Sequence, residues 1–77
     1  MPEDRSRVLE AICKICEQMF GEAALTGAEN FFELGGTSLD AVELISILKE
    51  NYGFVAEYTD VFEAETLAEL ADRIPGD

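Results

Sequence analysis

The chain has 77 residues, of which 17 are acidic, five are basic and none is histidine, so that its formal net charge is −12. This charge excludes nucleic acid and anionic membrane surfaces as partners, because no basic patch is available to neutralise phosphates. The length allows one small domain, which we expect to cover residues 1–77. A basic protein surface is the expected partner, although acidic residues can also serve only to keep a small protein soluble. No signal peptide or membrane-spanning run is seen, so we expect a cytoplasmic protein.

The first expected element is a helix from about Pro2 to Phe20. Its apolar residues follow the i, i+4, i+7, i+8, i+11 spacing of one helical face: Val8, Ile12, Ile15, Cys16 and Met19. Cys13 lies beside this face, and both cysteines are expected to be structural thiols, since free Cys behaves as a small hydrophobe. With no His and no further Cys in the chain, we expect neither a metal site nor a redox motif.

A long connection is expected from Gly21 to Thr37. Loops of more than about 12–15 residues are uncommon in compact domains and are often functional. Apolar side chains are expected to pin this loop to the core: Leu25, Phe31, Phe32 and Leu34. Its last part, Gly35-Gly36-Thr37, is small and flexible in sequence.

A second helix is expected from about Ser38 to Tyr52, with Gly53 as its stop. Either Thr37 or Ser38 can cap it. Asp40 and Glu43 place negative charge near its start, where the helix dipole favours it. At about 3.6 residues per turn, one face forms the core stripe: Ala41, Leu44, Ile45, Leu48 and Tyr52.

Two shorter helical segments complete the expected fold. A helical turn is predicted at Thr59–Phe62. Thr66 and Glu69 match a capping box for a last helix, which Pro75 and Gly76 would end. The apolar face of this helix consists of Leu67, Leu70, Ala71 and Ile74. Because no strand alternation is found, the expected fold class is all-α, with three main helices and a short third helix.

Ser38 is the candidate functional residue. It follows two glycines and Thr37 at the start of a helix, where unpaired backbone N–H groups and the helix dipole favour a phosphate ester. The alternative is that Ser38 only caps the helix, as serines commonly do.

The residues after Ser38 favour a docking role for the outer face of the second helix. Leu39 lies opposite the core stripe on a helical wheel, and Val42 lies at its edge. The remaining residues off the core face are Glu43, Ser46, Ile47 and Glu50. An exposed apolar cluster with a polar rim is typical of a binding surface.

Catalysis at Ser38 finds no support in the sequence. A serine nucleophile needs a general base, and the chain has no histidine. Neither Lys14 nor Lys49 has the Ser-x-x-Lys spacing to Ser38, and the Gly-x-Ser-x-Gly elbow and the phosphate loop are absent. We therefore expect no catalytic residues.

One stretch of the chain resembles the signature of acyl and peptidyl carrier proteins: Asn30-Phe31-Phe32-Glu33-Leu34-Gly35-Gly36-Thr37-Ser38-Leu39, followed by Asp40-Ala41-Val42-Glu43-Leu44. The helix order, the long first loop and the short third helix fit as well. The resemblance implies a right-handed bundle of four helices. It also implies that a phosphopantetheinyl transferase, using coenzyme A and Mg²⁺, attaches 4'-phosphopantetheine to Ser38. The thiol of this arm would carry an acyl or aminoacyl cargo as a thioester, and the carrier itself would not be a catalyst.

The resemblance further implies a set of partners. Leu39, Val42 and Glu43 match family positions that partner enzymes touch, and Thr37 and Ser46 complete the expected docking set. The expected partners of a monomeric carrier are the transferase, an adenylation or acyltransferase enzyme that loads the arm, and downstream synthase or tailoring enzymes with basic docking surfaces.

The subtype depends on two conflicting features. The Phe-Phe-x-Leu-Gly-Gly run looks like the peptidyl type, which serves nonribosomal peptide biosynthesis. Thr37 stands where many peptidyl carriers have His or Asp, and the acidity looks more like discrete acyl carriers of fatty acid or polyketide synthesis. We expect a discrete carrier of bacterial secondary metabolism, such as antibiotic biosynthesis, and we favour the peptidyl type slightly over the acyl type. An unmodified acidic helical adaptor for a basic partner is the alternative of another class, and an enzyme fragment comes third.

Overall fold

The computed structural model describes residues 2–75, with side chains from Ser6 onward. Its elements are α1 (Pro2–Phe20), α2 (Ser38–Ile47), a π-helical turn η1 (Leu48–Tyr52), α3 (Tyr58–Glu63) and α4 (Leu67–Asp72). No strand occurs in this described part, so the expected all-α bundle with a short third helix is confirmed. The predicted helix stop at Gly76 and the outermost domain residues 1 and 77 lie outside the described residues. Within residues 2–75, no helix is both long enough and apolar enough to cross a membrane.

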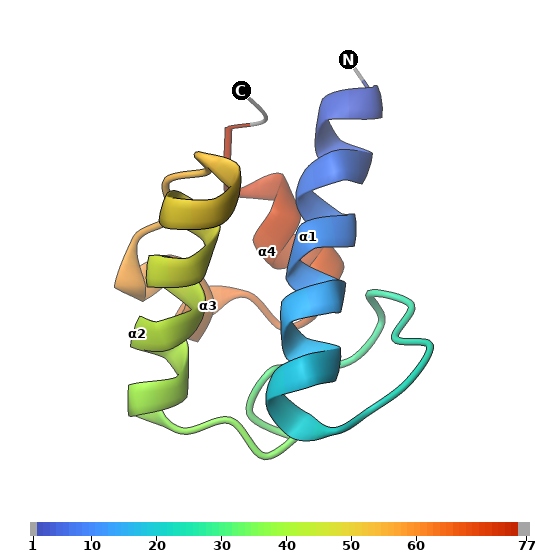
Figure 1. The fold of residues 1–77 in the computed structure, drawn as a ribbon, viewed down its shortest axis with the longest axis vertical. Helices are drawn as coiled ribbons and strands as arrows, with labels where there is room; N and C mark the ends of the chain where they lie inside the picture. Colours follow the sequence, from blue (N-terminus) through green and yellow to red (C-terminus); the bar gives the residue numbers. More distant parts are fainter. Residues whose placement is uncertain (1, 76–77) are drawn as a thin grey trace.

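The helices surround one apolar core. Figure 1 shows α1 and α2 running in opposite directions, with α3 and α4 packed behind them and both chain ends at the same end of the bundle. The predicted core face of α1 is confirmed, because Val8, Ile12 and Cys16 are fully buried. The predicted face of α4 is buried in full: Leu67, Leu70, Ala71 and Ile74. Both cysteines are free thiols buried in this core.

The long loop after α1 is packed onto the bundle, as expected. Phe31 is only 3% exposed, and the other predicted anchors are partly buried against the core. The loop also bonds to the start of α4, where the N–H groups of Leu67 and Ala68 donate to the carbonyls of Glu29 and Gly27 at 2.8 and 2.9 Å. The loop is therefore held at both its apolar side chains and its backbone.

The second predicted helix differs from expectation at its end. It is α-helical only to Ile47 and continues as the π-helical turn η1, in which each hydrogen-bonded turn contains an extra residue. This turn rotates Tyr52 out of the core stripe, so the prediction that Tyr52 faces the core is wrong, and its side chain is 41% exposed. Phe54 fills the core in its place and stacks on the Tyr52 ring at 6.1 Å. The predicted stop at Gly53 is confirmed by its left-handed backbone, with φ +76°.

Ile47 is a second correction on this helix. The sequence placed it off the core face, whereas its side chain is partly buried and packs against the core. It faces α1 and shares a shallow hollow with Ile15 and Met19. The outer face of α2 is therefore narrower than expected.

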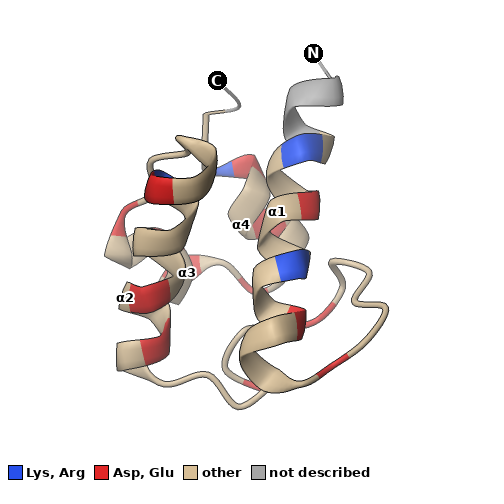
Figure 2. Ribbon diagram, viewed as in Figure 1, with Lys and Arg blue, Asp and Glu red and all other residues tan. Residues whose placement is uncertain are grey.

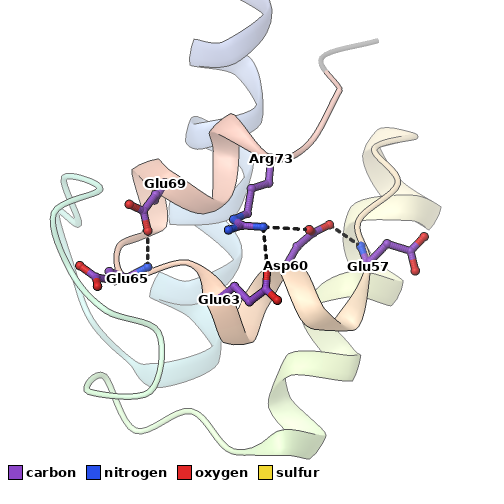
Figure 3. A network of polar contacts seen from close by, with 6 residues as sticks. All are labelled: Glu57, Asp60, Glu63, Glu65, Glu69 and Arg73. Carbon is purple, nitrogen blue, oxygen red and sulfur yellow. Dashed lines mark hydrogen bonds and ion pairs between the residues drawn. The ribbon is translucent and has the colours of Figure 1, made fainter.

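The short helices α3 and α4 are joined by one arginine (Figure 3). The Arg73 guanidinium lies 3.0 Å from a Glu63 carboxylate oxygen and 3.6 Å from one of Asp60. The cap of α4 by Thr66 is confirmed, since the Glu69 N–H donates to its hydroxyl at 3.1 Å. The reciprocal half of the predicted capping box is wrong, because the Glu69 carboxylate accepts from the N–H of Glu65 instead, at 2.6 Å.

Candidate functional site

Ser38 is the first residue of α2, at the end of the bundle away from the chain termini (Figure 1). Thr37 is the cap: its hydroxyl accepts from the Asp40 N–H at 3.2 Å, and the Asp40 carboxylate accepts from the Thr37 N–H at 3.0 Å. The alternative in which Ser38 caps the helix is therefore wrong. The Ser38 side chain is exposed, and its hydroxyl has no hydrogen-bond partner in the described part of the chain.

The two glycines that precede Thr37 and Ser38 pack against a buried aromatic ring. The Gly36 N–H donates to the Phe31 carbonyl at 3.2 Å. A Cβ at position 36 would lie 2.4 Å from Cε2 of the Phe31 ring and 2.8 Å from the Phe31 carbonyl oxygen. Gly35 before it has φ +108°, a conformation that favours glycine. The two glycines thus bring the backbone tightly past Phe31, and this close packing adds to the open access expected from the sequence.

The predicted docking residues lie together on the outer face of α2. Leu39 is 81% exposed and Val42 is 49% exposed. The other members of the predicted set are also exposed: Thr37, Glu43 and Ser46. A shallow hollow between α2 and the start of α3 borders this face and is lined in part by Val42, Ser46 and Tyr58. The structure therefore brings all five predicted docking residues to one accessible surface beside Ser38.

Two exposed aromatic residues of α3 were missed by the sequence reasoning. Tyr58 and Phe62 are 40% and 46% exposed. Their rings meet edge to face at 4.7 Å, and Phe62 also stacks on Phe32 of the long loop at 5.0 Å. The i, i+4 spacing of the two residues was the available signal, since such residues lie on one side of a helix.

The end of the molecule that carries Ser38 is acidic. Residues 15–48 contain no Lys or Arg, and they contain Glu17, Glu22, Glu29, Glu33, Asp40 and Glu43. In the ribbon of Figure 2 the charged positions along the long loop and the first turns of α2 are all acidic, whereas the described Lys and Arg residues lie on α1, on η1 and directly after α4. This distribution gives the site a negative field, which attracts basic surfaces.

Both thiols of the core have raised pKa values. Burial raises the pKa of Cys16 to about 12, with contributions from Cys13 and Glu17. Burial, followed by the charges of Glu29 and Glu17, also raises the pKa of Cys13. The expectation that these residues are structural thiols agrees with their burial in the core. Among the described residues, no group of His, Cys, Asp and Glu side chains is arranged to hold a metal ion.

A comparison with protein families decides what kind of domain this is. The sequence model of the phosphopantetheine attachment site family matches residues 6–74. The chain belongs to this family. Carrier domains of this family bear 4'-phosphopantetheine covalently on a serine, are not themselves catalysts, and are substrates of a phosphopantetheinyl transferase. The carrier resemblance found in the sequence is thereby confirmed.

Similar curated proteins include synthases of plipastatin and of gramicidins and a dimodular nonribosomal peptide synthase of Bacillus subtilis. The carrier is 33% identical over 73 residues to a component of plipastatin synthase from Bacillus subtilis, and 36% identical over 67 residues to gramicidin S synthase 2 of Brevibacillus brevis. It is 38% identical over 65 residues to a component of linear gramicidin synthase from Brevibacillus parabrevis. These matches cover 95%, 87% and 84% of the carrier but only 3%, 2% and 1% of the three relatives. The chain is thus homologous to the carrier segments of much longer proteins.

Proposed function

We propose that the chain is a single carrier domain that bears 4'-phosphopantetheine on Ser38 and holds acyl or aminoacyl intermediates as thioesters. The observation that supports this assignment is the free, exposed hydroxyl of Ser38 at the positive end of α2, which Thr37 has relieved of the capping role. Ser6 and Ser46 are also exposed, but they lie within α1 and α2 rather than at a helix start. The residues around Ser38 therefore fit a phosphate ester better than those around the other two serines.

The bound arm would supply a thiol for the cargo, and the protein's own contribution is the attachment point. Ser38 lies between a loop anchored by Phe31 and a helix whose start is fixed by Thr37. A flexible arm on a rigid base keeps the cargo at high local concentration near each partner's active site.

We propose that the outer face of α2 docks partner enzymes through Thr37, Leu39, Val42, Glu43 and Ser46. Their exposure next to Ser38 supports this role, since an apolar patch with a polar rim is typical of an interface. The partners would be the transferase, a loading enzyme and downstream synthase enzymes, each offering a basic surface to the acidic site. The monomeric state and the cytoplasmic location stay predictions.

The peptidyl type is our preferred subtype, with nonribosomal peptide biosynthesis as the pathway class. The names of two relatives support it: a nonribosomal peptide synthetase of Aspergillus hancockii and a dimodular nonribosomal peptide synthase of Bacillus subtilis. A discrete acyl carrier of fatty acid or polyketide synthesis is the second candidate, favoured by the net charge of −12. Charging of the modified protein by adenylation enzymes, tested in parallel with acyltransferases, separates the two subtypes.

The attachment site is tested with coenzyme A, Mg²⁺ and a broad-specificity phosphopantetheinyl transferase. We expect the intact mass to increase by one phosphopantetheine group in the wild type and in Ser6→Ala, and not to change in Ser38→Ala. A folded wild-type protein that gains no mass would instead support the unmodified acidic adaptor.

The docking surface is tested with Leu39→Asp and Val42→Asp. Both variants should keep their helical circular dichroism and lose rate in modification and loading, because a buried charge weakens an apolar interface. Val55→Asp, at a residue that is 59% exposed and outside the proposed set, is the matched control. Unfolding of either α2 variant would show that a core residue had been mistaken for a surface residue.

A further inference from the structure

The start of α2 contains two neighbouring hydroxyl groups that could each cap the helix. A cap residue uses its side-chain oxygen to accept a backbone N–H two or three residues later. If Ser38 took this role, one lone pair of its hydroxyl oxygen would accept a backbone N–H and the side chain would be held in the capping conformation, so the hydroxyl would react less readily. In the structure Thr37 is the cap instead, with the Asp40 N–H on its hydroxyl at 3.2 Å.

Asp40 reinforces this choice of cap. Its carboxylate accepts the Thr37 N–H at 3.0 Å, so the two residues exchange hydrogen bonds across the first turn. The same two bonds occupy two of the unpaired N–H groups that every helix start presents. On the loop side of the cap, Gly36 lies close against the Phe31 ring, and this packing limits how far the end of the loop can move. The helix start is thus fixed one residue before Ser38.

The intervening N–H groups are left free. Those of Ser38 and Leu39 have no acceptor within residues 2–75. At α4, which is also capped by a threonine, the corresponding N–H groups of Leu67 and Ala68 are bonded to loop carbonyls. The N–H groups of Ser38 and Leu39 are therefore the donors that a phosphate on the Ser38 hydroxyl would meet first.

We propose that Thr37 and Asp40 are positioning residues for the modification of Ser38, because their reciprocal hydrogen bonds take over the capping role and leave the Ser38 hydroxyl free to react. This inference rests on the proposed attachment at Ser38. In the transfer, the Ser38 oxygen forms a bond to the phosphorus that bears pantetheine in coenzyme A. The diphosphate bond to adenosine 3',5'-bisphosphate breaks, and the hydroxyl proton passes to a base of the transferase.

The decisive comparison is between Thr37→Ala and Thr66→Ala, which each remove one threonine cap of nearly equal geometry. In Thr37→Ala the nearest residue able to cap is Ser38. We expect kcat/KM for modification to fall about fivefold, which is the preference of a helix for a serine cap over an alanine cap. Thr66→Ala should be modified at the wild-type rate, and Thr37→Ser should recover that rate. Equal rates in Thr37→Ala and Thr66→Ala would overturn the proposal, as would a loss in Thr37→Ser equal to that in Thr37→Ala.

A second pair of variants leaves residue 37 unchanged. Asp40→Asn keeps a carbonyl oxygen that can accept the Thr37 N–H, whereas Asp40→Ala does not. We expect slower modification in Asp40→Ala than in Asp40→Asn, and the opposite order would contradict the positioning role.

Amide NMR spectra of the wild type provide a readout that does not depend on rate. On modification, the largest downfield shifts should belong to the amides of Ser38 and Leu39, and unchanged shifts there would contradict contact with the phosphate. If the wild type gains no phosphopantetheine, the proposed function fails. If the wild type is modified and the variants show no difference, only the positioning role fails.

Discussion

The starts of α2 and α4 use the same capping chemistry in opposite surroundings. Each helix begins after a threonine whose hydroxyl accepts the N–H three residues later, at 3.2 Å for Thr37 and 3.1 Å for Thr66. The residue after the cap is the exposed Ser38 in α2, whereas in α4 it is Leu67, which is 1% exposed. The cap therefore determines where a helix begins, but the rest of the chain determines whether that start is available to another molecule.

The long loop makes the difference between these two starts. It crosses the start of α4, where the carbonyls of Gly27 and Glu29 accept the first N–H groups of the helix. Gly27 comes so close that an added Cβ would lie 3.2 Å from Leu9 and 3.5 Å from Ala68. The loop then ends at α2 without crossing it. The same segment thus covers the start of α4 and leads into the start of α2 that carries the candidate serine.

The largest expected effect tests burial at the two starts. Leu67→Ala should lower the free energy of unfolding by about 2–5 kcal/mol, because it leaves a cavity in the core. Leu39→Ala, at a side chain that is 81% exposed, should change it by less than about 0.5 kcal/mol. Urea denaturation followed by circular dichroism measures both values. A similar loss in the two variants would remove the contrast between the starts.

The next largest loss of stability is expected from a substitution in the loop residues directly before α2. Gly36→Ala should destabilise the domain by about 1–3 kcal/mol, since the new methyl group would overlap the Phe31 ring and its carbonyl. Gly36 does not have a positive φ, so steric overlap and not backbone strain is the cause. Thermal denaturation measures the loss, and an unchanged melting temperature would show that the loop is not packed against Phe31 as described.

Most of the fold was predictable from the sequence, because the apolar spacing of α1 and α4 matches their buried faces. The exposure of the Tyr52 side chain was not predictable, since a helical wheel assumes the same number of residues in every turn and the π-helical turn η1 breaks that assumption. The position of the candidate serine was predictable from the Gly-Gly-Thr-Ser run. The sequence analysis left open which hydroxyl caps α2, although a signal was available: Thr37 has an acidic residue, Asp40, at the capping-box position three residues later, and Ser38 has Ala41 there. The loop bonds to α4 have no sequence signal at all.

Acidification should loosen the covered start of α4, where the loop is held by the Glu29 carboxylate. The hydrogen bond from the Thr26 N–H is the main cause that holds the pKa of Glu29 below its usual range. Burial acts in the opposite direction, and the hydrogen bond from the Gly27 N–H adds to the lowering. The Glu29 pKa is thus lower in the folded than in the unfolded protein. The ionised Glu29 carboxylate stabilises the protein fully above the pKa that Glu29 has in the unfolded chain. This stabilisation is lost as the pH falls through the lower pKa that Glu29 has in the folded protein.

Hydrogen exchange measured from pH 6 downward tests this effect locally. The amides of Leu67 and Ala68 should lose protection as Glu29 is protonated, because the loop that covers them is released. Glu29→Gln should show weaker protection of these amides already at neutral pH and less change on acidification. An equal loss of protection at the hydrogen-bonded amides in the interior of α2 would indicate general unfolding and contradict a local role of Glu29.

The smallest expected effect is the absence of a reaction at the two core thiols. The thiolate is the nucleophile, and with a pKa of about 12 only about one in 10⁴ Cys16 thiols is ionised at pH 8. Cys13 is shielded by the same burial and by the charges of Glu29 and Glu17, which raise its pKa.

In the modified protein, iodoacetamide should therefore label the arm at the exposed start of α2 and leave both cysteines unlabelled. Intact mass should show one adduct in the modified wild type, none in Ser38→Ala, and two in Ser38→Ala after denaturation in urea. Labelled Cys13 or Cys16 peptides from the folded protein would mean that the core around α1 opens, and the arm would then not be the sole reactive thiol of the carrier.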